Sequence, residues 1–263
     1  MAVITISRGS LSGGAKLAEL IGKRLGYEVL SREVIVEAAK TYGVSQDRIE
    51  SGLEQAPSLW SKFAGHAESY LLAVQATLAE LVEGGDAVYH GHGGSFLLGG
   101  LPGVLKVRLI APLSYRVESA IAQLGLTHQQ AAAHIQEIDR QRGKWVKSLY
   151  AEDWGDPSHY DIVLNVGDMS LETASEIVAC VASRKEYEWT PETATVVRDF
   201  AIKNRVRAHL RFRSHYPEVV VNVQVHKSVV RLSGDAAFEA AKTEIAQFVR
   251  TIAGVERVAF ERD

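Results

Sequence analysis

The sequence contains little cysteine, no long apolar run and almost no net charge. Its 263 residues include one cysteine, Cys180, which cannot form a disulfide within the chain. No apolar run reaches the roughly 18 residues that a membrane-spanning helix needs. The N-terminal residues lack the basic and apolar regions of a signal peptide, so we expect a reducing, cytoplasmic location. A net charge of −3 excludes a global field that would recruit nucleic acid.

The composition is that of a folded protein with two differently charged parts. Hydrophobic residues make up 46% and charged residues 23% of the chain, which is typical of globular domains. Residues 191–263 contain 12 Lys and Arg against 9 Asp and Glu, whereas residues 1–190 contain 17 against 23. The polar stretch 184–195, which includes Pro191, is therefore predicted to be a linker. It would separate one domain at 1–187 from another at 196–263.

Strands and helices alternate along the first of these regions. Predicted strands cover 2–7, 27–30, 87–90, 104–110 and 161–166, and predicted helices cover 15–25, 34–39, 59–82, 114–124, 127–149 and 170–183. Such alternation with short connections favours a mostly parallel sheet with helices on both faces. Ligands of these folds bind at the carboxyl ends of the strands. Two glycine-containing loops, 9–14 and 91–94, follow predicted strands.

The first glycine loop has the setting of a phosphate-binding loop. Residues 7–16 read SRGSLSGGAK and connect a predicted strand to a helix, whose first backbone N–H groups attract anions. A complete P-loop, GxxxxGK[ST], has a lysine for phosphate and a hydroxyl for Mg²⁺ directly after its last glycine. Here Ala15 and Lys16 follow Gly14. From its spacing, the loop is either a phosphate cradle or a tight strand-to-helix turn.

Six ordered motifs resemble the cytidylate kinase-like family, a branch of the P-loop nucleoside monophosphate kinases. They read ITISRGSLSGG, LGYEVLSREVIVEAA, VYHGHGGSFLL, LIAPLSYRVE, EIDRQRGKW and DWGDPSHYDIVLN, and they cover about residues 2–185. The resemblance implies a P-loop-type α/β fold and transfer of the γ-phosphoryl group of ATP to a nucleoside monophosphate, with Mg²⁺. It also places the P-loop lysine at Gly14, which favours an alternative: a catalytically degenerate nucleotide or phosphate sensor.

The resemblance implies that the first loop binds phosphate. The residues it assigns to the nucleotide in this loop are Ser10, Ser12, Gly13, Gly14, Ala15 and Lys16. Lys16, the first basic residue of the following helix, either reaches a phosphate or faces solvent.

Later motifs supply four further candidates. Arg32 either clamps the acceptor phosphate with its planar fork or pairs with a neighbouring acid. His92 stands where the family has an arginine, and it either contacts phosphate, acts as a base or is a loop residue. Arg140 and Arg142 lie where the family has its lid, in which arginines neutralise charge in the transition state. They are the candidate catalytic residues, and the alternative is a solvated helix face. No metal ligands are predicted.

The second region predicts a small α+β domain. Its elements are a helix at 196–213, strands at 219–225 and 229–234, a helix at 236–252 and a strand at 255–260. The string VNVQVHKSVVRLSGDA resembles a BON domain, which implies binding of phospholipid or of a protein partner. The first helix carries the basic residues Lys203, Arg205, Arg207, Arg211 and Arg213. These either dock an anionic partner or keep the surface soluble.

Overall fold

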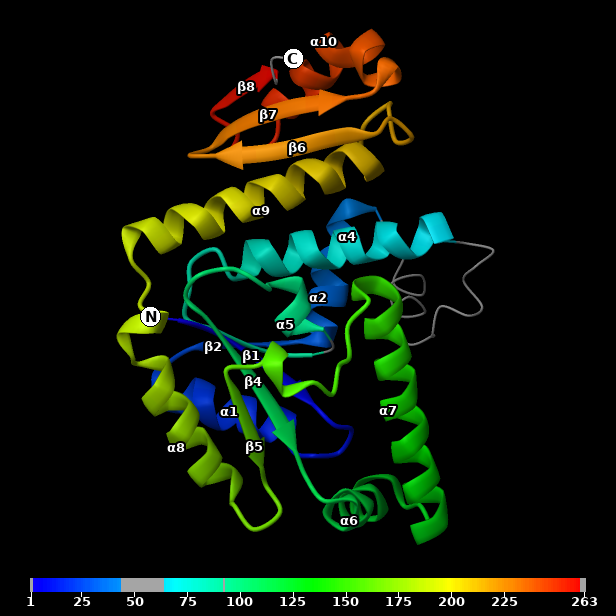
Figure 1. Cartoon of the computed structure of the whole chain (residues 1–263), viewed down its shortest axis with the longest axis vertical. Coiled ribbons are helices and arrows are strands. Elements are labelled where there is room, and N and C mark those ends of the chain that lie inside the picture. The colour runs from blue at the N-terminus through cyan, green and yellow to red at the C-terminus, as the bar shows by residue number, and fades with distance from the viewer. Residues whose placement is uncertain (1, 44–63, 92, 261–263) are drawn as a thin grey trace. The chain divides into compact units, whose positions relative to one another are not determined.

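A computed structural model describes residues 2–43, 64–91 and 93–260, and it divides into two compact units (Figure 1). The described part of the first unit lies mainly in residues 2–34 and 85–189, and that of the second in 35–43, 65–84 and 190–260. The second unit thus takes residues from both predicted sequence ranges. The boundaries 1–187 and 196–263 stay predictions. Within the described residues, no helix combines the length and apolarity needed to cross a membrane.

The first unit is built on a parallel sheet of five strands. They are β1 (Val3–Arg8), β2 (Glu28–Ser31), β3 (Ala87–His90), β4 (Val104–Ile110) and β5 (Ile162–Asn165), in the order β2-β3-β1-β4-β5. At the centre, Ile4 of β1 lies in register with Val88 of β3 and Leu105 of β4. All three side chains are fully buried, as expected for a parallel sheet covered on both faces. The predicted α/β fold is confirmed.

Helices cover the sheet of the first unit on both faces. On one face, α1 (Gly14–Leu25) and α8 (Leu171–Ala182) lie side by side, and they share one apolar core with the strands (Figure 1). Thr5 and Tyr89 alternate with the residues of that core and point to the opposite face. There they meet Gly94 of the short helix α5 (Gly94–Leu97).

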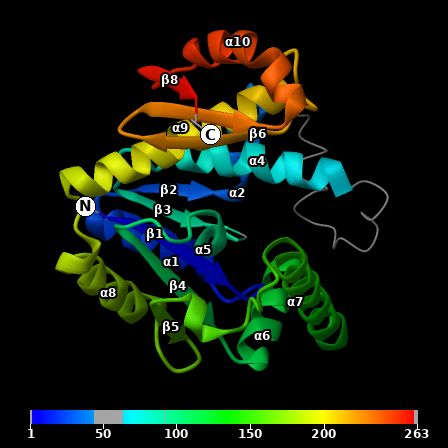
Figure 2. The ribbon, with the colours of Figure 1, turned by 45° about the horizontal axis from the view of Figure 1, so that its top comes forward.

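Two further helices follow the carboxyl end of β4. They are α6 (Leu113–Leu124) and α7 (His128–Tyr150), and two views show them side by side (Figures 1 and 2). Thr127 and Gln130 form a capping box at the start of α7, which satisfies two backbone donors. Val117, Ala120, Ala131 and Ile135 form a small core for this pair. The single-turn helices η3 (Pro157–His159) and η4 (Lys185–Tyr187) complete the unit.

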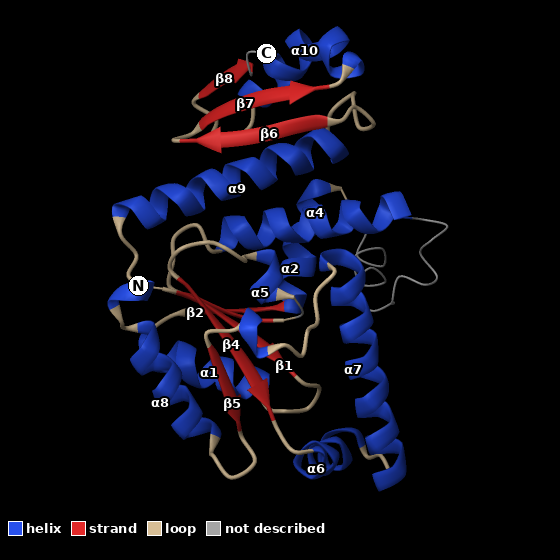
Figure 3. Ribbon diagram, viewed as in Figure 1, coloured by secondary structure: helices blue, strands red, loops and turns tan. Residues whose placement is uncertain are grey.

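The second unit contains a three-stranded sheet with helices (Figure 3). Its elements are η1 (Lys40–Tyr42), α4 (Ala64–Leu81), α9 (Pro191–Phe212), β6 (Val221–His226), β7 (Val229–Gly234), α10 (Ala236–Arg250) and β8 (Arg257–Phe260). Helix α2 (Arg32–Ala39) is divided between the units. The first residue of α4, Ala64, belongs to the first unit, and the rest of that helix belongs to the second. β6 pairs antiparallel and β8 parallel with β7. Both α9 and α10 contribute to one apolar core with these strands, so the predicted α+β fold is confirmed.

Helix α9 begins earlier than its apolar pattern indicates. It starts at Pro191, inside the predicted linker, rather than at 196. The side chain of Thr190 accepts a hydrogen bond from the Thr193 N–H at 3.1 Å, and proline suits the first helical position. The letters TPET therefore hold a start signal that apolar spacing does not show. Of the helix predicted over 59–82, residues 59–63 lie outside the described residues.

The turn between β6 and β7 has a left-handed backbone without glycine. Lys227 and Ser228 have φ values of 47° and 60°, a region that is unfavourable for residues with a side chain. Asp199 of α9 accepts the N–H groups of both residues, at 2.6 and 2.8 Å. The carboxylate of Asp199 therefore stabilises a turn for which the sequence lacks the usual asparagine and glycine.

Candidate phosphate-binding site

The loop between β1 and α1 lies at the carboxyl end of the central strand. Leu11 and Gly13 both have positive φ values, 60° and 84°, and the Ser12 hydroxyl donates to the Gly9 carbonyl at 2.8 Å. Gly13 precedes α1 and provides no side-chain cap. Because the first N–H groups of a helix have no acceptor within it, the first turn of α1 can receive an anion.

A polar network joins this loop to α6 and α7. The N–H and hydroxyl groups of Ser10 donate to Oδ1 of Asp139 at 3.1 and 3.0 Å. Arg116 donates to the carbonyl and hydroxyl oxygens of Ser10 at 2.7 and 2.9 Å, and to Oδ2 of Asp139. The side chain of Leu11 packs against the core of the two helices. The loop is thus held in shape by residues more than 100 positions away.

The side chain of Arg8 crosses the start of α1. A Cβ atom on Gly14 would lie only 2.0 Å from Cδ of Arg8, so glycine is required at that position while the arginine stem lies there. Nε of Arg8 is buried and has no hydrogen-bond partner among the described residues. Burial lowers the pKa of Arg8, while the charges of Glu33 and Tyr89 act in the opposite direction.

The predicted loop residues are distributed between this cradle and the surface. Gly13, Gly14 and Ala15 form the start of α1, and Ser10 is bonded to Asp139 as described. Lys16 is exposed and its Nζ lies 3.4 Å from Glu19, one turn along α1. Their assignment to phosphate stays a prediction.

The two predicted lid arginines take different positions. Arg140 donates to Glu137 from Nε at 2.8 Å and from Nη2 at 2.6 Å, on the exposed side of α7. These bonds lower the pKa of Glu137 to about 2. Arg142 donates from Nη1 to the carbonyl oxygen of Arg8 at 3.1 Å. The structure therefore brings Arg142, but not Arg140, to the loop.

Two predicted site residues cannot be placed. His92 lies outside the described residues, and Arg32 is described only as the first residue of α2, without its side chain. Their roles as phosphate contacts stay predictions.

A buried polar cluster supports the end of β1. Ser7 Oγ receives hydrogen bonds from Arg108 at 3.1 Å and from the Trp154 indole at 3.0 Å, and the Tyr160 hydroxyl lies 3.2 Å away. The Arg108 guanidinium stacks on Trp154, 3.8 Å from the ring centroid, and burial lowers its pKa. The sequence reasoning missed Arg8, Arg108, Arg116 and Asp139. Only Arg8 has a local signal, since it directly precedes the loop.

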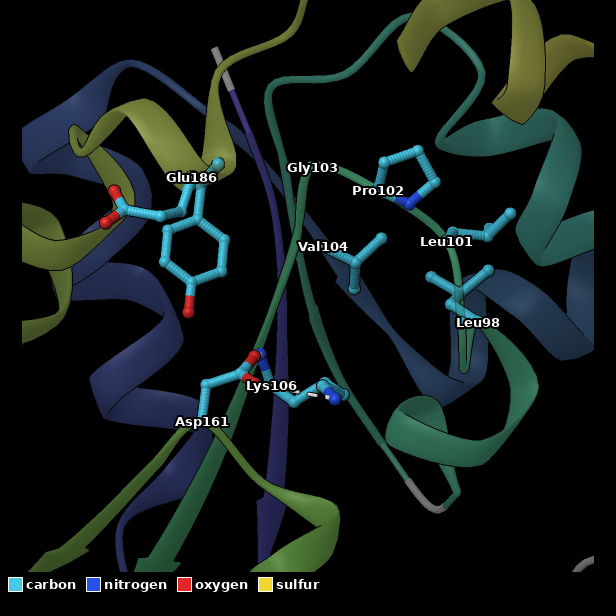
Figure 4. Close-up of a pocket in the computed structure, with 10 residues that line it drawn as sticks. Leu98, Leu101, Pro102, Gly103, Val104, Lys106, Asp161 and Glu186 are labelled. Atoms are coloured by element: carbon cyan, nitrogen blue, oxygen red, sulfur yellow. Dashed lines mark hydrogen bonds and ion pairs between the residues drawn. The ribbon is translucent and has the colours of Figure 1, made fainter.

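A separate hollow of about 330 Å³ lies at the amino-terminal ends of β4 and β5 (Figure 4). Its apolar wall includes Leu98, Leu101 and Pro102, and its polar wall includes the ion pair between Lys106 and Asp161, at 3.5 Å. Parallel strands place their amino-terminal ends on the edge opposite the loop. Since ligands of this architecture bind at the carboxyl ends, the loop rather than this hollow is the candidate ligand site.

The donor atoms at the loop fit phosphate groups and do not fit a protein-held Mg²⁺ ion. The uncapped helix start and the unpartnered Nε of Arg8 are donors for anionic oxygens. Ala15 has no hydroxyl, and the Asp139 carboxylate is bonded to Ser10 and Arg116. Among the described residues, no three His, Cys, Asp or Glu side chains gather as metal ligands.

The sheet order, with a glycine loop between the central strand and α1, defines a P-loop kinase-like α/β domain. The chain belongs to the cytidylate kinase-like family, whose model matches residues 3–168. A BON domain follows and matches residues 198–260.

Similar proteins include a relative that agrees with this assignment. A cytidylate kinase from Methanopyrus kandleri is 27% identical over 196 residues, which cover 71% of this chain and 96% of that protein. A 95-residue stretch, 36% of this chain, is 35% identical to a uronate isomerase from Corynebacterium glutamicum but spans only 18% of it. The crystal structure of an uncharacterized protein from Eubacterium ventriosum has a TM-score of 0.56 at 17% identity, covering 70% of this chain and 99% of that one. That likeness shows a shared fold.

Proposed function

We propose that the protein binds a nucleoside triphosphate at this loop and transfers its γ-phosphoryl group to a nucleoside monophosphate. The observation that carries the proposal is the uncapped start of α1 with the half-buried Arg8 side chain across it, whose buried Nε has no partner among the described residues. Phosphoryl transfer needs positioning and charge neutralisation rather than a nucleophile on the protein. Backbone N–H groups and arginines can provide both.

Each element of the site has a distinct task in this proposal. The N–H groups of Gly14, Ala15 and Lys16 bind phosphate oxygens, since they begin α1. Arg142 lies at the loop and Arg140 one half-turn away, and they neutralise charge as the phosphoryl group moves. Arg140 must leave Glu137 for this role, which an exposed ion pair allows at small cost. Mg²⁺ bound to ATP would add further charge neutralisation.

The second candidate function is a nucleotide or phosphate sensor without catalysis. Two observations favour it: the N–H and hydroxyl groups of Ser10 already donate hydrogen bonds to Asp139, and Ala15 has no hydroxyl group. The loop would then bind a ligand without the arrangement needed for transfer. In both cases we propose that the BON domain binds a partner or phospholipid.

A coupled assay with ATP and each of CMP, UMP and AMP distinguishes the two functions, provided that ATP binding is measured on the same samples. Phosphotransfer to one acceptor supports the kinase. In that case Arg140→Ala should lower kcat much more than it raises KM, because a lid arginine acts on the transition state. ATP binding without transfer to any acceptor supports the sensor, and absence of ATP binding contradicts both.

Binding through the BON domain requires a separate test. Lys203 and Arg207 are exposed on α9, whereas Arg211 lies 2.9 Å from Glu218. A triple alanine variant at Lys203, Arg207 and Arg211 should lose co-sedimentation with anionic phospholipid vesicles while its ATP affinity stays unchanged. Equal sedimentation of the variant and the unmodified protein would exclude this basic surface.

A further inference from the structure

We propose that Arg8 is the phosphate-binding cation of this loop and that it takes the place of the P-loop lysine, which the family resemblance aligns with Gly14. The inference rests on the proposed function and names the group that would contact the terminal phosphates of a nucleoside triphosphate. It assigns this contact to a residue at the end of β1, before the loop, instead of one in the first turn of α1.

The packing between Arg8 and Gly14 excludes two cations side by side. A Cβ atom at position 14 would lie 2.0 Å from Cδ and 3.0 Å from Cγ and Nε of Arg8. Real Cβ atoms do not approach so closely, so any side chain at position 14 would displace the arginine stem. The space into which a lysine at position 14 would extend is therefore filled by Arg8. The position of the Arg8 side chain therefore explains why no lysine can stand at position 14.

The guanidinium group of Arg8 has donor capacity that the described residues leave unused. Its Nε is buried without a hydrogen-bond partner, and an unsatisfied buried donor is unfavourable. A phosphate oxygen at the start of α1 would satisfy it, and the planar fork of arginine suits a bidentate contact with an oxyanion. Burial would also strengthen this contact, because water competes less there.

A comparison with Arg108 shows that burial alone does not explain Arg8. Arg108 is 7% exposed, and it donates to Ser7 and stacks on Trp154. Its partners are all parts of the fold, so its role is structural. The backbone carbonyl of Arg8, by contrast, is held by Arg142, while Nε of its own side chain is left without a partner. That arrangement positions a side chain for a ligand.

The first test is the affinity for ATP, measured by titration calorimetry on the full chain. Arg8→Met keeps the apolar stem over Gly14 and removes the donors, and it should weaken ATP binding by about 10- to 100-fold. Arg24→Met is the matched control: it makes the same change on the same unit, at an exposed residue that contacts Glu176. The control should bind ATP like the unmodified protein. Thermal unfolding of each variant checks that the fold is retained, and Arg8→Lys, which keeps the charge, should lose less affinity than Arg8→Met.

The second test exchanges the two positions. Gly14→Lys alone should lower the thermal stability and should not improve ATP binding, because the new stem collides with Arg8. The double variant Arg8→Ala/Gly14→Lys should recover affinity to within about tenfold of the unmodified protein, whereas Arg8→Ala alone should not. Unchanged ATP affinity in Arg8→Met, or no recovery in the double variant, would overturn the inference and leave the proposed function standing. Failure of the unmodified protein to bind ATP would instead overturn the proposed function, and the inference with it.

Discussion

Two pairs of elements, one in each unit, are joined by arginines with different partners. In the first unit, Arg116 and Arg142 donate to backbone carbonyls of Ser10 and Arg8 and so determine the shape of one loop. In the second unit, Arg205 bonds to Glu80 at 2.8 Å and lies 3.5 Å from Glu83, and thereby joins α9 to α4. The first set fixes the shape of the candidate phosphate-binding loop, and the second set joins helices.

This difference shows why charge totals do not predict binding surfaces. Residues 1–190 carry the acidic excess, yet Arg8, Arg116 and Arg142 lie together at the loop between β1 and α1. Residues 191–263 carry the basic excess, yet several of their arginines contact groups of their own unit. Arg198, Arg205 and Arg211 lie near carboxylates, and Arg213 donates to the Thr41 carbonyl.

The largest expected effect on stability concerns the turn that α9 supports. Asp199→Ala removes the acceptor of two N–H groups, at Lys227 and Ser228, and should lower the free energy of unfolding by about 2–3 kcal/mol. Urea denaturation measures this. Ser228→Gly, which relieves the positive φ of 60°, should raise stability by about 1 kcal/mol in the unmodified background. If Asp199→Ala unfolds at the same urea concentration as the unmodified protein, α9 does not stabilise the turn.

The next prediction concerns Arg205, which joins α9 to α4. Arg205→Met leaves Glu80 without its cation, although the Tyr42 hydroxyl still donates to Glu80 at 2.5 Å. Because the pair is partly exposed, we expect a loss of about 1–2 kcal/mol in the free energy of unfolding. Lys203→Met on the same helix is the control. A loss of ATP affinity beyond twofold in Arg205→Met would contradict the conclusion that Arg205 serves only to join α9 to α4.

Arg116→Met tests the loop-shaping role. It removes the donors to the Ser10 carbonyl and hydroxyl oxygens, so the loop should lose its fixed geometry and ATP should bind about tenfold more weakly. Calorimetry of ATP binding, together with thermal unfolding, separates this from a loss of folding. Lower stability with unchanged ATP affinity would show that Arg116 stabilises the fold, as Arg205 does, without affecting ATP binding.

The smallest effect is a pH dependence within the first unit. Burial, assisted by the charge of Arg8, lowers the pKa of His90, while Glu33 and Glu19 oppose this. The unfolded chain therefore binds a proton near pH 6.5 that the folded chain rejects, and stability should decrease as the pH falls below about 6.5. His90→Gln should flatten that decrease in urea denaturation between pH 5 and 8. An unchanged slope would contradict a role for His90.

The sequence predicts the sheets well because each strand carries its own signal. The β-branched runs that became β1 and β4 are buried on both sides, and their apolar pattern requires no knowledge of their neighbours. The apolar spacing predicts the start of α9 too late, at 196 instead of 191. Its first turn is specified by the cap at Thr190 and by Pro191 rather than by apolar spacing.

The candidate site is less predictable because its contacts are distant in sequence. Asp139 meets Ser10 across 129 positions, and Arg116 meets it across 106. No local pattern shows such a pairing. The interaction between Arg8 and Gly14 spans only six positions, yet it depends on how the strand end folds over the helix, which spacing does not reveal.

The discontinuity of the second unit affects how the protein is made. Its helix α4 is synthesised about 110 residues before its partner α9, and the strands β3, β4 and β5 of the first unit are synthesised in the interval. At about 5–20 residues per second, Glu80 waits roughly 5–25 s for Arg205. The sheet of the first unit can therefore form on the ribosome while α4 still lacks α9. During that interval the residues of α4 that contact α9 in the finished protein have no partner from that helix.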